Sequence, residues 1–150
     1  MKHAGAFGAW LAVAVLVSGV AASSVGASTG VASLRFYERP GQTTVVDNAP
    51  KGKTVGRGDI VLYANPVFDR QGTQVGTDHG VCTMIGARQA QCDATLSLPK
   101  GQIVTNGLQG LKMSFEVAVI GGTGSYAGAR GAMTARPLKD GGATILISLI

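Results

Sequence analysis

The stretch VIGGTGSYAGARG, residues 119–131, places a run of glycines between two apolar segments and decides how the end of the chain folds. A dinucleotide-binding fingerprint would need a strand, a glycine turn, a helix and an acidic residue about 20 positions later. Gly122 and Gly124 lie near the end of the chain, and the residues after them allow one short helical turn at most. We therefore interpret these glycines as structural, supplying positive φ angles and close packing between two strands.

Short segments suited to strands recur along the rest of the chain, and no long segment has helical periodicity. Of the 150 residues, 23 are glycine and only 14% are charged, which favours short strands and tight turns over helices. The segments we predict as strands are 32–38, 44–47, 58–68, 73–85, 90–98, 102–109, 113–120, 131–136 and 143–149, of which 44–47 is either a strand or a bridge.

Alternating side chains and short connections indicate how these strands are arranged. Cys92, Ala94 and Leu96 point to one side of their segment, and Phe115, Val117 and Val119 share a face in theirs. Short turns between successive strands imply antiparallel neighbours, and about eight strands can remove their edges by closing. The predicted fold is all-β, a single closed antiparallel eight-stranded barrel.

The first 27 residues differ from the rest of the chain. A short basic start is followed by an uncharged apolar run that ends in small residues, which is the pattern of a secretory signal peptide. A retained membrane anchor is the alternative. We interpret residues 1–27 as a signal peptide and residues 28–150 as the barrel domain, and we expect the mature protein to be secreted or otherwise extracytoplasmic, with no membrane attachment after cleavage.

Cys82 and Cys92 are the two cysteines of the chain. If Ile85 pairs with Gln89 across a three-residue turn, counting back along both strands places the two cysteines directly opposite each other, at a spacing that a disulfide can span. An exported chain also reaches a compartment that permits disulfides. We predict a Cys82–Cys92 disulfide; two buried free thiols are the alternative.

The charged residues exclude several classes of partner and site. The net charge of +5 falls to +4 when Lys2 leaves with the signal peptide, and the remaining basic residues are scattered, without the stripe of a nucleic-acid binder. We expect no nucleic-acid partner. His79 and Cys82 are too few ligands for zinc, so no metal site is predicted. Asp78 and His79 face opposite sides of their strand and do not form an acid–base pair.

The glycine stretch resembles the GGTG-aromatic segment of plant dirigent proteins, and its setting resembles the related segment of allene oxide cyclases. The resemblance extends over residues 34–136. LRFYE at 34–38, GDIVLYANPVFD at 58–69 and VGTDHGVCTMI at 75–85 carry it, together with the hairpin that follows. It implies an eight-stranded barrel around an apolar cavity that binds a small hydrophobic ligand. The related barrels often form dimers or trimers, so a homo-oligomer is compatible with it.

The resemblance also implies candidate site residues. Glu38 matches a glutamate that acts on developing cationic charge, Asn65 an asparagine that helps to hold a water, and Cys82 a pocket cysteine. Pro40 and Gln109 depart from the cyclase pattern. The expected catalytic residues are Glu38 and Asn65. A charge at the barrel rim is the alternative for Glu38, and a bulge or turn residue is the alternative for Asn65. The expected ligand-binding residues are Tyr63, Val67, Met84 and Gln109.

The resemblance leads to a function hypothesis and one alternative from a different class. The barrel would bind a small hydrophobic molecule and direct its stereoselective cyclisation or coupling without a cofactor, as an isomerase or cyclase. A non-catalytic secreted barrel with an interior filled by side chains is the alternative. An internal void of ligand-pocket size, roughly 300 Å³ or more, lined by Glu38 and Asn65, would distinguish the first from the second.

Overall fold

The computed structural model of the chain describes residues 32–48, 55–111 and 113–150, and these ranges hold nine strands and one 3-10 turn. The predicted signal peptide, residues 1–27, lies outside the described residues. The elements are β1 (Ala32–Glu38), β2 (Gln42–Val46), β3 (Ile60–Phe68), β4 (Gln74–Gly86), β5 (Gln89–Leu98), β6 (Gly101–Gly110), β7 (Phe115–Gly122), η1 (Gly124–Tyr126), β8 (Gly131–Pro137) and β9 (Ala143–Leu149).

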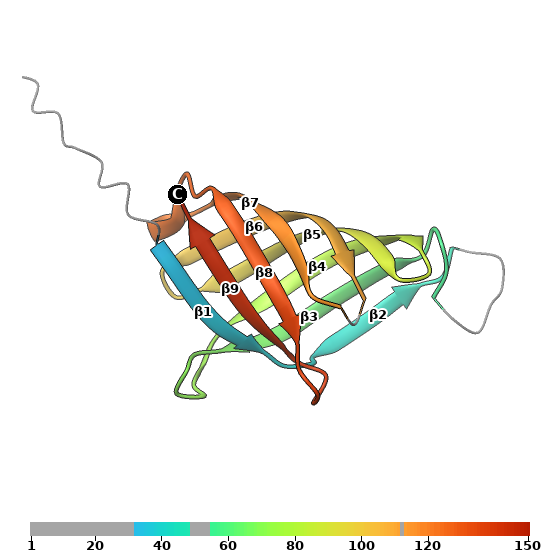
Figure 1. Cartoon of the computed structure of the whole chain (residues 1–150), viewed down its shortest axis with the longest axis horizontal. Helices are drawn as coiled ribbons and strands as arrows, with labels where there is room; N and C mark the ends of the chain where they lie inside the picture. Colours follow the sequence, from blue (N-terminus) through green and yellow to red (C-terminus); the bar gives the residue numbers. More distant parts are fainter. Residues whose placement is uncertain (1–31, 49–54, 112) are drawn as a thin grey trace, which may run out of the picture.

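The strands form one antiparallel sheet that closes on itself (Figure 1). From β3 to β9 each strand pairs with the next along the chain. β1 pairs along its whole length with β9, and its last two residues, Tyr37 and Glu38, pair with Phe68 and Val67 of β3. This second contact closes the barrel, so the predicted eight-stranded antiparallel barrel is confirmed.

β2 is an additional strand, outside the eight that close the barrel. It pairs with β3 from Gln42 opposite Ala64 to Val46 opposite Ile60, so the segment predicted as a strand or a bridge is a strand of five residues. β1 and β2 thus occupy the same edge of β3, one after the other. Residues 39–41, between β1 and β2, are in no strand. β2 then runs alongside β3, beyond the part of β3 that pairs with β1 (Figure 1).

The β4–β5 hairpin carries the predicted disulfide. Cys82 lies opposite Cys92, and their sulfurs are bonded at 2.06 Å. The predicted pairing of Ile85 with Gln89 is wrong, because Gly86 pairs with Gln89 and the register shifts between Met84 and Gly86. A two-residue connection is the favoured link of a hairpin, and a bulge at Ile85 absorbs the extra residue without disturbing the cysteine register.

Side chains that point into the barrel pack densely at one end. This core cluster is formed by Val67, Leu96, Ile103, Val117, Val119, Ala129, Met133, Ala135, Ile145 and Ile147. The glycine stretch closes the same end: Tyr126 of η1 packs against the cluster, and the N–H of Ser125 donates to the carbonyl of Lys100 at 2.8 Å. Gly124 has a φ of +59°, which favours glycine. The residues after the glycines form one short helical turn, η1, which is the most that the sequence was expected to allow.

Candidate functional site

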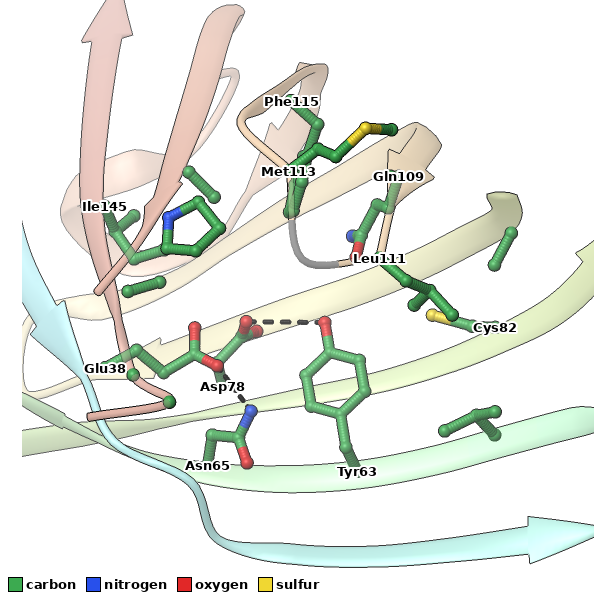
Figure 2. A pocket seen from close by; sticks show the side chains of 18 of the residues that line it. Glu38, Tyr63, Asn65, Asp78, Cys82, Gln109, Leu111, Met113, Phe115 and Ile145 are labelled. Carbon is green, nitrogen blue, oxygen red and sulfur yellow. Dashed lines mark hydrogen bonds between the residues drawn. The ribbon is translucent and has the colours of Figure 1, made fainter. Parts of the chain in front are cut away.

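The other end of the barrel is hollow. A cavity of about 580 Å³ lies between β1, β3, β4 and β5 on one side and the ends of β6 to β9 on the other (Figure 2). Its volume exceeds the roughly 300 Å³ expected of a ligand pocket. The apolar part of the lining includes Val61, Met84, Met113, Phe115, Met133 and Ile145. At this end, therefore, the interior of the barrel is not filled by side chains.

Four polar side chains meet on one wall of the cavity: Glu38 from β1, Tyr63 and Asn65 from β3, and Asp78 from β4 (Figure 2). Asn65 Nδ2 donates a hydrogen bond to Glu38 Oε1, and the Tyr63 hydroxyl donates to Asp78 Oδ2 at 3.4 Å. The register explains the meeting, because Asn65 lies opposite Asp78 on β4 and Glu38 lies opposite Val67 on β3.

The two carboxyl groups are coupled. Burial, then the negative charge of Asp78, raises the pKa of Glu38 from 4.5 to about 7. Burial raises the pKa of Asp78 to about 6, against the opposing effect of the hydrogen bond from Tyr63. A hydrogen bond between the two carboxyls favours the proton on Glu38 and the charge on Asp78. Near neutral pH, Asp78 is therefore mainly ionised while Glu38 exchanges a proton.

Tyr63 lies over a glycine. Gly80 is its partner on β4, and a Cβ built on Gly80 would lie 2.2 Å from two carbons of the Tyr63 ring. Because Gly80 has no side chain, the Tyr63 ring can occupy this space, and from there its hydroxyl reaches Asp78. Burial and the charges of Asp78 and Glu38 raise the pKa of Tyr63, and Gln109 hydrogen-bonds its hydroxyl. Tyr63 is thus a neutral hydrogen-bonding group at ordinary pH.

Asn65 has a second contact that fixes its orientation. Its Oδ1 accepts a hydrogen bond from the N–H of Gly41 at 2.9 Å, at the break between β1 and β2. The side chain therefore links this break to Glu38. The register shift in β3 falls between Val67 and Phe68, so Asn65 itself is neither a bulge nor a turn residue.

The structure brings most of the sequence-predicted site residues together. Those that line the cavity are Glu38, Tyr63, Asn65, Cys82, Met84 and Gln109. Val67 lies elsewhere: its side chain is fully buried in the packed core cluster and is not part of the cavity lining. Val67 points inward, but at its level the interior is filled by the core cluster.

Asp78 is the site residue that the sequence reasoning missed. Alternation was used to separate Asp78 from His79, and the structure agrees: Asp78 is buried while His79 is exposed. The same alternation also puts Asp78 on the face of Cys82 and Met84, which were already assigned to the interior. That signal was sufficient to place the carboxylate in the cavity.

The described residues hold neither a cluster of metal ligands nor a membrane-spanning helix. No group of three or more His, Cys, Asp or Glu side chains in these ranges is arranged to hold a metal ion. Within the same ranges, no helix has the length and apolar character needed to cross a membrane.

Comparison with known protein families identifies the barrel. The model of the allene oxide cyclase barrel-like domain matches residues 40–147. The chain belongs to this family. The resemblance drawn from the glycine stretch and the strand segments is therefore confirmed. A search of curated proteins gave no match.

Solved structures with the same fold are functionally diverse. A pyocyanin demethylase is 23% identical, with a TM-score of 0.70 over 79% of this chain and 100% of its own. The pterocarpan synthase dirigent protein GePTS1 is 19% identical, with a TM-score of 0.63 over 80% of this chain and 83% of its own. The exo-specific intermolecular Diels-Alderase AbnU is 19% identical, with a TM-score of 0.59 over 80% and 98%. At these identities the likeness establishes the fold, on which different chemistries occur.

Proposed function

We propose that this allene oxide cyclase-like barrel binds a small hydrophobic molecule and directs its cyclisation or coupling, acting as a cyclase or isomerase that needs no cofactor. The observation that carries the proposal is the cavity of about 580 Å³, whose apolar walls enclose the hydrogen-bonded group of Glu38, Asn65, Tyr63 and Asp78. Apolar walls with a few convergent polar groups are typical of sites that fix the orientation of a small ligand.

The chemistry follows from the two environments of the cavity. The apolar walls restrict the ligand to few conformations, which lowers the entropic part of a cyclisation barrier. Glu38, with its pKa near neutral, donates or accepts one proton. Asp78 stabilises positive charge that develops as a ring closes or opens, and the amide of Gln109 offers a hydrogen bond to a ligand oxygen. Two of the structures with this fold, a pterocarpan synthase dirigent protein and an intermolecular Diels-Alderase, support this class of reaction.

Export is part of the proposal. The Cys82–Cys92 disulfide is of the kind that forms and persists outside the cytoplasm, and the first 27 residues have the composition of a signal peptide. We expect protein recovered outside the cytoplasm to begin after Ala22 or Ala27. Intact mass measurement tests this, and a mass that includes the apolar N-terminal run would contradict it.

Binding is tested with a neutral fluorescent probe, N-phenyl-1-naphthylamine. We expect fluorescence enhancement with the purified barrel and a loss of at least about tenfold in affinity for Ala90→Phe, which places a ring in the cavity beside Met84. Ala118→Phe is the matched control, because Ala118 is exposed on the outer face of β7. Equal probe binding by both variants would show that the cavity is not the binding site.

Catalysis is tested by incubating the barrel with small hydrophobic molecules trapped from culture medium and separating the products by chiral chromatography with mass detection. A cyclisation changes the retention time at constant mass, and a coupling changes the mass. Glu38→Gln should retain probe binding and lose the conversion, because the amide cannot exchange the proton. If Glu38→Gln converts its ligand as fast as the natural chain, Glu38 has no role in proton transfer.

A further inference from the structure

The polar wall of the cavity has an unbalanced charge. Two carboxyl groups lie side by side there, and Asp78 is only 6% exposed. In the described part of the chain, Lys139 is the one basic side chain of the cavity lining, and it is exposed in the β8–β9 turn. His79 acts electrostatically on Asp78 from the outer face of β4, but it does not line the cavity. A buried carboxylate with no cation on the cavity side is costly, and the cost falls when a positive group arrives there.

The hydrogen-bond donors on this wall are already directed at the carboxyls. The single hydroxyl proton of Tyr63 goes to Asp78, and the amide of Asn65 donates to Glu38. The amide oxygen of Asn65 is also occupied, by the N–H of Gly41. What the wall still offers to a ligand is chiefly carboxyl oxygen, which accepts hydrogen bonds and attracts positive charge. An anionic ligand would meet these carboxyls and be repelled.

We infer that the ligand is a hydrophobic cation, such as a protonated amine or a nitrogen heterocycle, whose charged nitrogen lies against Glu38 and Asp78 while its carbon skeleton contacts the apolar walls. This inference rests on the proposed function, since it requires that the cavity binds a ligand. The Tyr63 ring forms part of the same wall, and aromatic faces attract cations. Lys139 at the mouth does not oppose the inner carboxyls, because it is exposed to solvent.

Three probes that share a naphthalene ring and are similar in size test the inference by calorimetry: 2-naphthylmethylammonium, neutral 2-methylnaphthalene and 2-naphthoate. At pH 8 we expect the ammonium probe to bind at least about tenfold more tightly than the carboxylate probe. Asp78→Asn should reduce this ratio severalfold. Asp93→Asn is the matched control, because Asp93 lies on the outer face of β5, where Asn106 donates to it.

The pH dependence tests the same point without a cavity variant. The ratio of ammonium to carboxylate affinity should fall between pH 8 and pH 5 as Glu38 and Asp78 take up protons. The other titratable groups nearby are Tyr63 in the cavity, Lys139 at its mouth and His79 on the outer face of β4. Because His79 acts electrostatically on Asp78, the measurement is repeated with His79→Gln, in which the ratio should still fall.

The outcomes separate the two proposals. If 2-methylnaphthalene binds but the ammonium probe has no advantage over the carboxylate probe at pH 8, the charge preference is wrong and the hydrophobic cavity stands. If none of the three probes binds, the proposed function fails together with the inference. The inference would also be overturned if Asp78→Asn kept the full preference for the ammonium probe while its melting temperature equalled that of the natural chain.

Discussion

Gly80 determines where the Tyr63 ring lies, because the ring occupies the space that any other side chain at this position would fill. The nearest ring atoms are 2.2 Å from a built Cβ and the hydroxyl oxygen is 2.5 Å from it. The ring is the free end of a side chain, so it can move aside at a low cost in stability. The hydroxyl, however, would then leave Asp78. Gly80 is thus a positioning residue for the site.

We predict that Gly80→Ala weakens binding of the neutral probe severalfold and lowers the pKa of Tyr63 toward its ordinary value, because the displaced ring becomes more solvated. Absorbance titration of tyrosine and probe fluorescence measure the two effects. Gly86→Ala on the same strand is the control, since a Cβ built there meets no atom within 4 Å. A tyrosine titration that is identical in the natural chain and both variants would show that Gly80 does not position the ring.

At this scale, alternation predicted which residues of β5 and β7 share the inward face, but not where the interior is hollow. Glu38 and Asn65 were identified through family resemblance, since a glutamate beside two arginines and an asparagine before a proline have common structural roles as well. Val67 was assigned to the site although it belongs to the packed core. Alternation reports that a side chain points inward, but whether the space there is empty depends on all the strands together.

Among the elements, the turn between β7 and β8 depends most on a single residue. A Cβ built on Gly122 would lie 2.4 Å from the carbonyl oxygen of Tyr126 and 2.5 Å from that of Gln102. Both are backbone atoms, held by the turn and by the β6 strand, and neither can move without breaking hydrogen bonds. Gly121, the preceding residue, would have only one contact, at 3.9 Å with the Arg130 side chain.

We therefore predict that Gly122→Ala lowers the free energy of unfolding by about 3 kcal/mol, as overpacking against fixed atoms does. Gly121→Ala should change it by less than about 0.5 kcal/mol. Urea denaturation of the two variants measures the difference. Equal stability of the pair would mean that the turn is held by something other than the absent side chain of Gly122.

Strand boundaries and register were predictable where residue chemistry fixes them. Counting back from an assumed turn placed Cys82 opposite Cys92 and Met84 opposite Ala90 correctly, although the turn pairing itself was wrong by one residue. The bulge at Ile85 was not predicted, because nothing in its side chain distinguishes it from a paired residue. β2 was predicted at 44–47 as either a strand or a bridge, because its residues are exposed and only its pairing with the edge of β3 makes it a strand.

The whole molecule combines a packed end, which supplies the stability, with a hollow end, which supplies the site. In the hollow end the fold places two carboxyls where burial disfavours their charge, and the pKa values rise to about 7 for Glu38 and about 6 for Asp78. Between about pH 4 and pH 7 the folded protein therefore binds more protons than the unfolded chain does. A state that binds more protons is stabilised by acid, so stability should decrease as the pH rises through this window.

We predict that these two groups contribute about 2 kcal/mol more to the free energy of unfolding at pH 5 than at pH 8. Each unit of pKa shift corresponds to about 1.4 kcal/mol, and solvent exposure and the interaction between the two carboxyls reduce the total. Because other groups titrate as well, the quantity to compare is the change from pH 5 to pH 8 in the natural chain and in Glu38→Gln, each measured by urea denaturation. Glu38→Gln should lose most of this acid stabilisation, since its amide has no proton to release, whereas Asp93→Asn on the outer face should retain it. If the natural chain and Glu38→Gln changed equally with pH, the buried proton assigned to Glu38 would not exist, and the proposed proton exchange in the cavity would have no group to perform it.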